Sequence, residues 1–325
     1  MDDRRSFSMV NIMLKYYFKL IRYPNLLMLI LSQCLIRYFL IKPIVESNGG
    51  QMALSDFNFF LLVMITLLIS GAGYIINDYF DLEGDKINKP LKLIIGHHFS
   101  VEQSRMIYFV MNLTALAAGS YLSVQLGLWQ LAVIFLIIVL MLWYYSARYK
   151  RMMFWGNFVV SSLTAFSLFI VWMVEFFALR ANPNLYVQNL NSIHLVNVFI
   201  YGYVFFAFIT SMIREIIKDA EDVEGDMRVQ CRTIPIVLGQ RIARLIAIFL
   251  IVMSMGALVY AMIKLWEFNY DVLFWYVAVV LQPLHIFLIY KVYLSNTSDD
   301  FHNASTYSKV LMLAGLLSMV LISFH

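Results

Sequence analysis

The protein has 325 residues, of which 62% are hydrophobic and 14% are charged, and its mean hydropathy is +0.76. Soluble domains carry roughly 45–50% apolar and 25% charged residues, so this composition excludes an ordinary soluble fold. Apolar segments recur along the whole chain, which predicts a single integral-membrane domain over residues 1–325. The two cysteines, Cys34 and Cys231, lie far apart, which argues against a disulfide framework or a cysteine-based metal site.

Segments apolar enough to cross a bilayer, with about 20 residues each, follow a charged segment at residues 1–19. That first segment lacks the short apolar core of a removable signal peptide, so we expect it to remain as a cytoplasmic tail. The sequence predicts an all-α fold, a bundle of nine transmembrane helices. Their expected positions are 20–40, 57–77, 105–124, 128–146, 154–179, 195–217, 242–264, 273–292 and 309–323.

Basic residues are segregated to one side of this arrangement. Of the 24 Lys and Arg residues, all but four lie in the N-terminal tail or near the ends of spans that face the same side as that tail. The four on the other side are Arg37, Lys42, Arg180 and Lys264. By the positive-inside rule, we expect a cell-membrane protein with its N-terminus in the cytoplasm and its C-terminus outside.

An acidic motif occurs twice, once at the end of the second span and once at the end of the sixth. Both copies read Asp-x-x-Asp-x-Glu-Gly-Asp, and an even number of spans separates them, so both are expected on the cytoplasmic face. The first copy contains Asp78, Asp81 and Asp85 and is preceded by Asn77; the second contains Asp219, Asp222 and Asp226.

If each copy continues its helix, its three aspartates lie on one face, within about 60 degrees of each other. Such a stripe repels itself unless cations intervene, and carboxylate oxygens together with substrate phosphates suit Mg²⁺. Neither copy has a nearby His or Cys, which argues against zinc. In the alternative reading, the acidic residues only solvate two cytoplasmic loops. Calcium binding is a weaker alternative, because the spacing is helical.

Basic and polar residues near these motifs could bind the oxygens of a metal-held phosphate. The candidates are Arg22 and Asn25 at the first span, Tyr145, Arg148, Lys150 and Arg151 after the fourth, and Arg214 and Lys218 on the sixth. Juxtamembrane Lys and Arg residues also follow from topology alone and could contact only lipid headgroups. Arg214 and Lys218 could equally be internal ion-pair partners. Glu175 lies near an outer helix end, where we expect it to snorkel to the interface or to be exposed.

The paired acidic motifs and the nine spans resemble the UbiA-type intramembrane prenyltransferases over nearly the whole chain. The family's first motif, Asn-Asp-x-x-Asp-x-x-x-Asp, matches Asn77 to Asp85, and its second, Asp-x-x-x-Asp, matches Asp222 and Asp226. Arg22 with Asn25, and Tyr145 with Lys150, resemble two further signatures. The stretch from Arg214 to Asp226, followed by Arg-Thr-Ile-Pro, is most similar to the digeranylgeranylglyceryl phosphate synthase branch of the family.

The resemblance implies a magnesium-dependent enzyme that transfers a polyprenyl group, geranylgeranyl in this branch, from its diphosphate to a glycerophosphate ether lipid in the bilayer. As a hypothesis for this chemistry, Asp78, Asp81, Asp222 and Lys150 are the catalytic residues, and Asp78 is the candidate base for a hydroxyl acceptor. Residues 92–98 depart from the proline-rich stretch of many relatives, which leaves an aromatic quinone precursor such as dihydroxynaphthoate as an alternative acceptor. A transporter of divalent cations or lipids is the alternative from another class. No feature of the sequence indicates a nucleic-acid partner.

Overall fold

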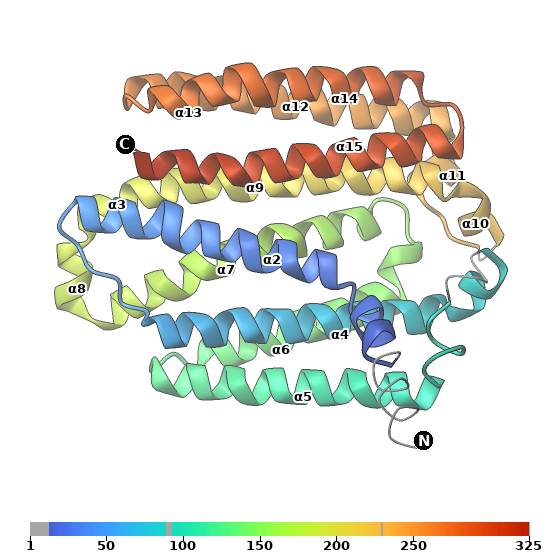
Figure 1. The fold of residues 1–325 in the computed structure, drawn as a ribbon, viewed down its shortest axis with the longest axis horizontal. Helices are drawn as coiled ribbons and strands as arrows, with labels where there is room; N and C mark the ends of the chain where they lie inside the picture. Colours follow the sequence, from blue (N-terminus) through green and yellow to red (C-terminus); the bar gives the residue numbers. More distant parts are fainter. Residues whose placement is uncertain (1–12, 89–92, 229, 325) are drawn as a thin grey trace, which may run out of the picture. The chain divides into compact units, whose positions relative to one another are not determined.

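A computed structural model describes residues 13–88, 93–228 and 230–324. These residues are almost entirely helical, and one isolated β-bridge joins Ile95 and Phe99 (Figure 1). A short helix at 13–20 comes first. The helices that follow are α2 (Tyr23–Leu35), η1 (Ile36–Ile41), α3 (Lys42–Ser47), α4 (Asp56–Asn88), α5 (Val101–Gln125), α6 (Gln130–Ala147), η3 (Tyr149–Arg151), α7 (Trp155–Ala181), α8 (Pro183–Gln188), α9 (Leu190–Glu221), α10 (Val223–Arg228), α11 (Ile234–Leu238), α12 (Gln240–Glu267), α13 (Asp271–Tyr276), η4 (Val277–Leu281), α14 (Gln282–Leu294), α15 (Ser298–Leu317) and η5 (Ser318–Phe324).

Within the described residues, nine helical segments are long and apolar enough to cross a membrane, which confirms the predicted fold class. They are Tyr23–Ser47, Asp56–Glu83, Val101–Gln125, Gln130–Ala147, Trp155–Ala181, Leu190–Glu221, Gln240–Glu267, Asp271–Leu294 and Ser298–Ser323. Each overlaps one predicted span.

The ninth helix begins at Ser298, well before the predicted start at residue 309. Its first turns are polar, which hides them from a hydropathy criterion. The helix nevertheless starts there because Thr297 and Asp300 form a capping box, in which the Thr297 hydroxyl accepts from Asp300 N and the Asp300 carboxylate accepts from Thr297 N.

The chain divides into two compact units, and the boundary falls within α2. The first unit comprises residues 1–31 and 56–148. In it, α4 packs on both α5 and α6. Gly119 of α5 allows close approach to α6, because a Cβ at this position would lie 2.6 Å from a ring carbon of Phe135. The single domain expected over residues 1–325 therefore stays a prediction.

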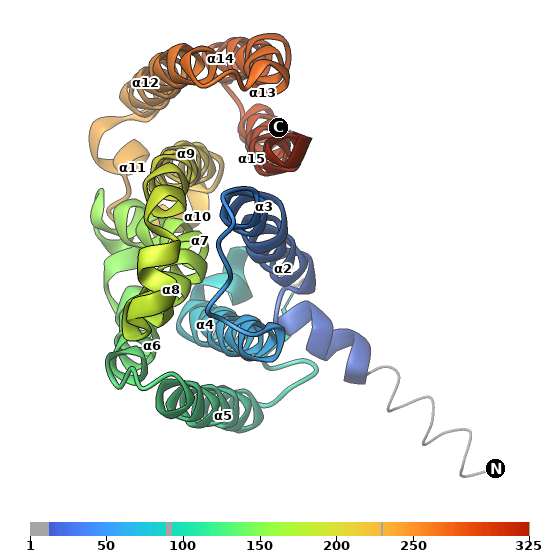
Figure 2. The same ribbon diagram turned by 90° about the vertical axis from the view of Figure 1, so that its left-hand side faces the viewer.

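In the second unit, residues 32–55 and 149–325, α9 is the central helix. It packs against α7, α12 and α15 (Figures 1 and 2). Gly315 of α15 lies directly against the ring of Phe206 on α9, so that a larger residue would collide with it. About one helical turn away, the hydroxyls of Tyr203 and Ser318 are 2.8 Å apart.

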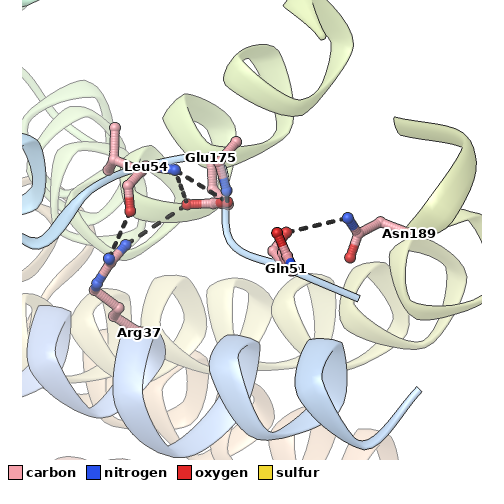
Figure 3. A network of polar contacts seen from close by, with 6 residues as sticks. Arg37, Gln51, Leu54, Glu175 and Asn189 are labelled. Carbon is pink, nitrogen blue, oxygen red and sulfur yellow. Dashed lines mark hydrogen bonds and ion pairs between the residues drawn. The ribbon is translucent and has the colours of Figure 1, made fainter. Parts of the chain in front are cut away.

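A buried ion pair lies in the second unit, between η1 and α7. Arg37 Nη1 is 3.6 Å from a carboxylate oxygen of Glu175, and the two side chains are 4% and 1% exposed. Glu175 accepts from the backbone N–H groups of Ala53 and Leu54, and Arg37 donates to the carbonyl of Leu54 at 2.7 Å (Figure 3). The expectation that Glu175 is exposed is therefore wrong.

The reason for this burial is the loop before α4, whose backbone groups have no helical partners. Glu175 and Arg37 supply the acceptor and the donor that the loop lacks. Next to them, the Asn189 side-chain amide donates to the carbonyl of Gln51 at 3.1 Å (Figure 3). The loop is thus attached to the second unit by buried polar contacts.

We expect Glu175→Gln to destabilise the protein by about 3–5 kcal/mol, because it leaves the Arg37 charge buried without a counter-charge. The thermal unfolding midpoint in detergent should fall accordingly. Glu46→Gln is the matched control, because Glu46 pairs with Lys42 at 3.8 Å through exposed side chains, and such pairs contribute about 0–1 kcal/mol. Equal midpoints for the two variants would contradict a stabilising role of the buried pair.

Candidate active site

The first acidic motif lies entirely within α4, as predicted. The side-chain amide of Asn77 donates to Asp81 Oδ2 at 3.0 Å, across one helical turn. Asp78 accepts from Arg22 Nη2 at 2.6 Å. Three predicted site residues of the first motif are therefore linked to one another or to Arg22 by direct contacts, and Asp85 follows one turn later on the same helix.

Arg22 reaches Asp78 from a sharp turn between the helix at 13–20 and α2. Its backbone has a φ of 52°, in the left-handed region that a non-glycine residue rarely adopts. The guanidinium also lies 5.1 Å from the ring centroid of Tyr74. Burial lowers the pKa of Arg22, but the carboxylates of Asp78 and Asp81 raise it by more. The pKa therefore lies above its ordinary value, and the group stays charged.

Other predicted residues of the first unit lie at its surface. Asn25 is exposed, and its backbone N–H donates to the carbonyl of Arg22 at 2.9 Å. Arg148 is exposed at the end of α6, where it donates to the Tyr144 hydroxyl at 3.3 Å. Tyr145 is half-buried on the same helix.

The second acidic motif is not one continuous helix, contrary to the prediction. α9 ends at Glu221, and α10 begins at Val223, so Asp222 lies at the junction between them. Asp219 belongs to α9 and Asp226 to α10. The single stripe calculated for an ideal helix therefore holds for the first motif but not for the second.

Asp219 is held by Asn157 of α7, whose side-chain amide donates to Asp219 Oδ2 at 2.8 Å. The negative charges of Glu215 and Asp226 and the positive charge of Lys218 also act on Asp219. Arg214 lies 2.6 Å from the Glu215 carboxylate, so it is an internal ion-pair partner, one of the two roles that the sequence allowed.

The loop that follows the second motif lies beside the basic turn η3, which contains Lys150 and Arg151. The carbonyl of Asp226 accepts from Cys231 N at 2.9 Å, and the next residue, Arg232, donates its backbone N–H to the Arg151 carbonyl at 3.0 Å. The structure thus places the basic turn and the second motif in the same region of the second unit.

The donor atoms of both motifs suit a hard divalent cation. They are carboxylate and amide oxygens, without His or Cys, which is the set that magnesium prefers. Within the described part of the chain, no three His, Cys, Asp or Glu side chains form a ready metal site, and the two motifs belong to different units. Joint metal binding by the two motifs stays a prediction.

The sequence did not reveal the role of Asn157 or the contacts that Glu221 makes with α15. Asn157 is a single polar residue in the first turn of an apolar span, and only its partner Asp219 gives it a role. Within the motif, the Glu221 carboxylate is 2.8 Å from His302 Nδ1, and the Glu221 carbonyl accepts from the Ser298 hydroxyl at 2.9 Å. These contacts join residues from distant helices, which no local pattern reveals.

Comparison with known proteins identifies the family of this chain. The model of the UbiA prenyltransferase family matches residues 47–316. The chain belongs to the UbiA prenyltransferase family. It is accordingly a multi-pass membrane protein and a transferase of prenyl groups.

Curated relatives from archaea cover most of the chain of this family member. Digeranylgeranylglyceryl phosphate synthase from Sulfolobus acidocaldarius is 28% identical over 81% of this chain and 85% of its own. The protein of the same name from Methanobrevibacter smithii is 28% identical over 95% of this chain and 98% of its own.

Solved structures of UbiA-family proteins share the fold. A digeranylgeranylglyceryl phosphate synthase structure has a TM-score of 0.58 at 22% identity, with 96% of this chain and 98% of the other covered. A UbiA homologue from Archaeoglobus fulgidus, bound to GPP and Mg²⁺, has a TM-score of 0.57 at 11% identity, with 94% and 99% covered.

We expect Asn157→Leu to reduce diphosphate release from a prenyl diphosphate roughly tenfold to a hundredfold, because a hydrogen bond to a charged group is worth about 1.5–3 kcal/mol. The magnesium concentration for half-maximal rate should rise as well, which a loss of packing alone would not cause. Ser162→Ala on the same helix is the control, since its hydroxyl only donates to the Phe158 carbonyl. Full turnover and unchanged magnesium dependence in Asn157→Leu would show that Asp219 does not need this donor.

Proposed function

We propose that the protein transfers a geranylgeranyl group from its diphosphate to a glycerophosphate ether lipid within the bilayer. The main support is that relatives named digeranylgeranylglyceryl phosphate synthase match nearly the full length of the chain. The Arg-Thr-Ile-Pro sequence after the second motif, which resembles the same branch, adds to it.

The two acidic motifs are the proposed magnesium ligands. The first set is Asn77, Asp78, Asp81 and Asp85, and the second is Asp219, Asp222 and Asp226. When bound there, magnesium supplies positive charge that stabilises the departing diphosphate. A homologue of the same fold was solved with GPP and Mg²⁺, which agrees with this chemistry.

The basic and polar residues around the motifs are the proposed partners of the substrate oxygens. They are Arg22, Asn25, Tyr145, Arg148, Lys150, Arg151, Arg214 and Lys218. Lys150 is proposed to donate charge-assisted hydrogen bonds to the oxygens of the reacting diphosphate. Arg22 pairs with Asp78 at 2.6 Å. The role we propose for Asp78 is to accept the proton of the acceptor hydroxyl.

Residues 93–99 support a second candidate acceptor, an aromatic quinone precursor. In place of the proline-rich stretch of many relatives, this chain has a loop in which Gly96 N donates to the Phe99 carbonyl at 2.7 Å. Ile95 and Phe99 are buried in the core of the first unit with Leu20 and Ile21. A loop packed in this way could select a different acceptor.

The proposed orientation has the N-terminus and both acidic motifs at the cytoplasmic face and the C-terminus outside, in the cell membrane. The segregation of Lys and Arg supports it. Single cysteines introduced at Asn296 and at Asn269 test the orientation, because a membrane-impermeant thiol reagent applied to intact cells should label only the second. Labelling of Asn296→Cys alone would reverse the assignment.

We expect Asp81→Ala and Asp222→Ala each to lower magnesium-dependent diphosphate release more than about a hundredfold, because each removes a charged metal ligand. Purified protein supplied with geranylgeranyl diphosphate provides the assay. Asp271→Ala is the control, since Asp271 is exposed in the first turn of α13, away from both motifs in the sequence. Unchanged turnover in either motif variant would refute the assignment of its motif.

The same assay, run with a panel of acceptors, identifies the product. Product is expected with geranylgeranylglyceryl phosphate and not with dihydroxynaphthoate. Product with the naphthoate alone would replace the ether-lipid proposal by the quinone one.

A further inference from the structure

The contact between α9 and α15 brings charged residues of two distant segments together. The helices run antiparallel, and their register follows from three contacts: Glu221 with His302, Phe206 with Gly315, and Tyr203 with Ser318. Lys309, between the first and second of these contacts along α15, therefore lies beside the stretch of α9 that contains Arg214 and Lys218. The positive charges of both residues, and the negative charges of Glu215 and Glu221, act on Lys309.

Most charges at this contact have a partner, but two do not. Arg214 pairs with Glu215 at 2.6 Å, and Glu221 contacts His302 at 2.8 Å. Among the described residues, neither Lys218 nor Lys309 has a hydrogen-bond or ion-pair partner for its Nζ. Lys309 is exposed and Lys218 is half-buried.

Two such lysines at the membrane-proximal parts of spanning helices are costly. Lys309 lies 11 residues after Ser298, which is about 16 Å along α15 from its first residue. Glu215 and Glu221 act on Lys309, but each of them contacts another basic side chain, and two ammonium groups close together repel each other. An anion bound between them removes this repulsion.

This location is separate from the carboxylate that faces α7. Asp219 points to Asn157 of α7, whereas Glu221 contacts α15 through His302. The charge of Lys218 acts on Asp219 as well as on Lys309. An anion held by Lys218 and Lys309 would therefore adjoin the second acidic motif.

We propose that Lys218 and Lys309 form a subsite that binds the phosphate of a phosphorylated lipid acceptor next to the second acidic motif. The proposal rests on the proposed function and adds a recognition group for the acceptor, with Lys309 as its new member. A phosphate monoester fits two ammonium groups better than a neutral or aromatic headgroup does, because each can donate charge-assisted hydrogen bonds to it. The subsite selects acceptors that carry a phosphate.

Lys309→Gln tests the subsite through binding, so that the result does not depend on turnover. The protein in phosphatidylcholine nanodiscs is titrated with geranylgeranylglyceryl phosphate and, in parallel, with geranylgeranylglycerol. We expect the variant to bind the phosphate lipid roughly tenfold or more weakly, since a charge-assisted hydrogen bond contributes about 1.5–3 kcal/mol, and to bind the unphosphorylated lipid like the wild type. Arg241→Gln, which removes an exposed charge near the start of α12, is the matched control and should bind both lipids normally.

Competition with phosphatidylglycerol, a phosphodiester, distinguishes a site for a phosphate monoester from general attraction of anionic bilayer headgroups. The subsite proposal expects phosphatidylglycerol, at the same mole fraction, to leave binding of the phosphorylated acceptor unchanged. Displacement by phosphatidylglycerol, equal losses for both test lipids, or unchanged binding in Lys309→Gln would each overturn it. If the wild type binds the phosphate lipid in this manner but never prenylates it, the proposed function fails while the subsite stands.

Turnover supplies a second readout if the proposed function holds. Lys309→Gln should raise the KM for the phosphorylated acceptor roughly tenfold and leave the KM for geranylgeranyl diphosphate unchanged, and Lys309→Arg should restore the acceptor KM. A parallel rise in both KM values would overturn the assignment to the acceptor.

Discussion

Charged groups at the ends of apolar helices have to be compensated, because neither the hydrocarbon layer nor a packed helical bundle solvates them. This chain meets that requirement in two ways. Away from the acidic motifs, Arg37 and Glu175 compensate each other and the neighbouring backbone, and both side chains are almost completely buried. In the acidic motifs, Arg22 pairs with Asp78, and Asn157 donates to Asp219. The first arrangement is a structural polar network, and the second belongs to the candidate active site.

Helix α9 connects the proposed site with the helices that pack around it. Its C-terminal end presents Asp219 to α7 and Glu221 to α15, and its apolar part packs on α7, α12 and α15. A single helix thus carries a proposed metal ligand on one side and basic residues on the other. Because the packing of its apolar part sets the rotation of the helix, the positions of both polar sides depend on contacts far from the chemistry. The Gly315 contact with Phe206 is one of these.

The two acidic motifs have the same sequence pattern but different structures. The first remains helical through Asp85, whereas the second is interrupted at Asp222, and its chain turns through α10 toward the basic turn η3. The hydrogen bond from Arg232 N to the Arg151 carbonyl attaches the chain after the second motif to this turn. A local repeat therefore does not imply a repeated geometry, because the segments that follow each copy pack differently.

The sequence by itself determined the features that depend on local composition. The nine spans follow from apolar length, the acidic repeat and its basic neighbours follow from residue identity, and together they indicate the UbiA family. The interruption at Asp222, the burial of Glu175 and the partnership of Asn157 with Asp219 were decided only by the tertiary structure. Each of the last two depends on a contact between residues distant in sequence. The start of the ninth helix depends on a local cap formed by Thr297 and Asp300, which a hydropathy criterion does not register. A hydropathy pattern contains none of this information, because it records what each residue is and not which residue it meets.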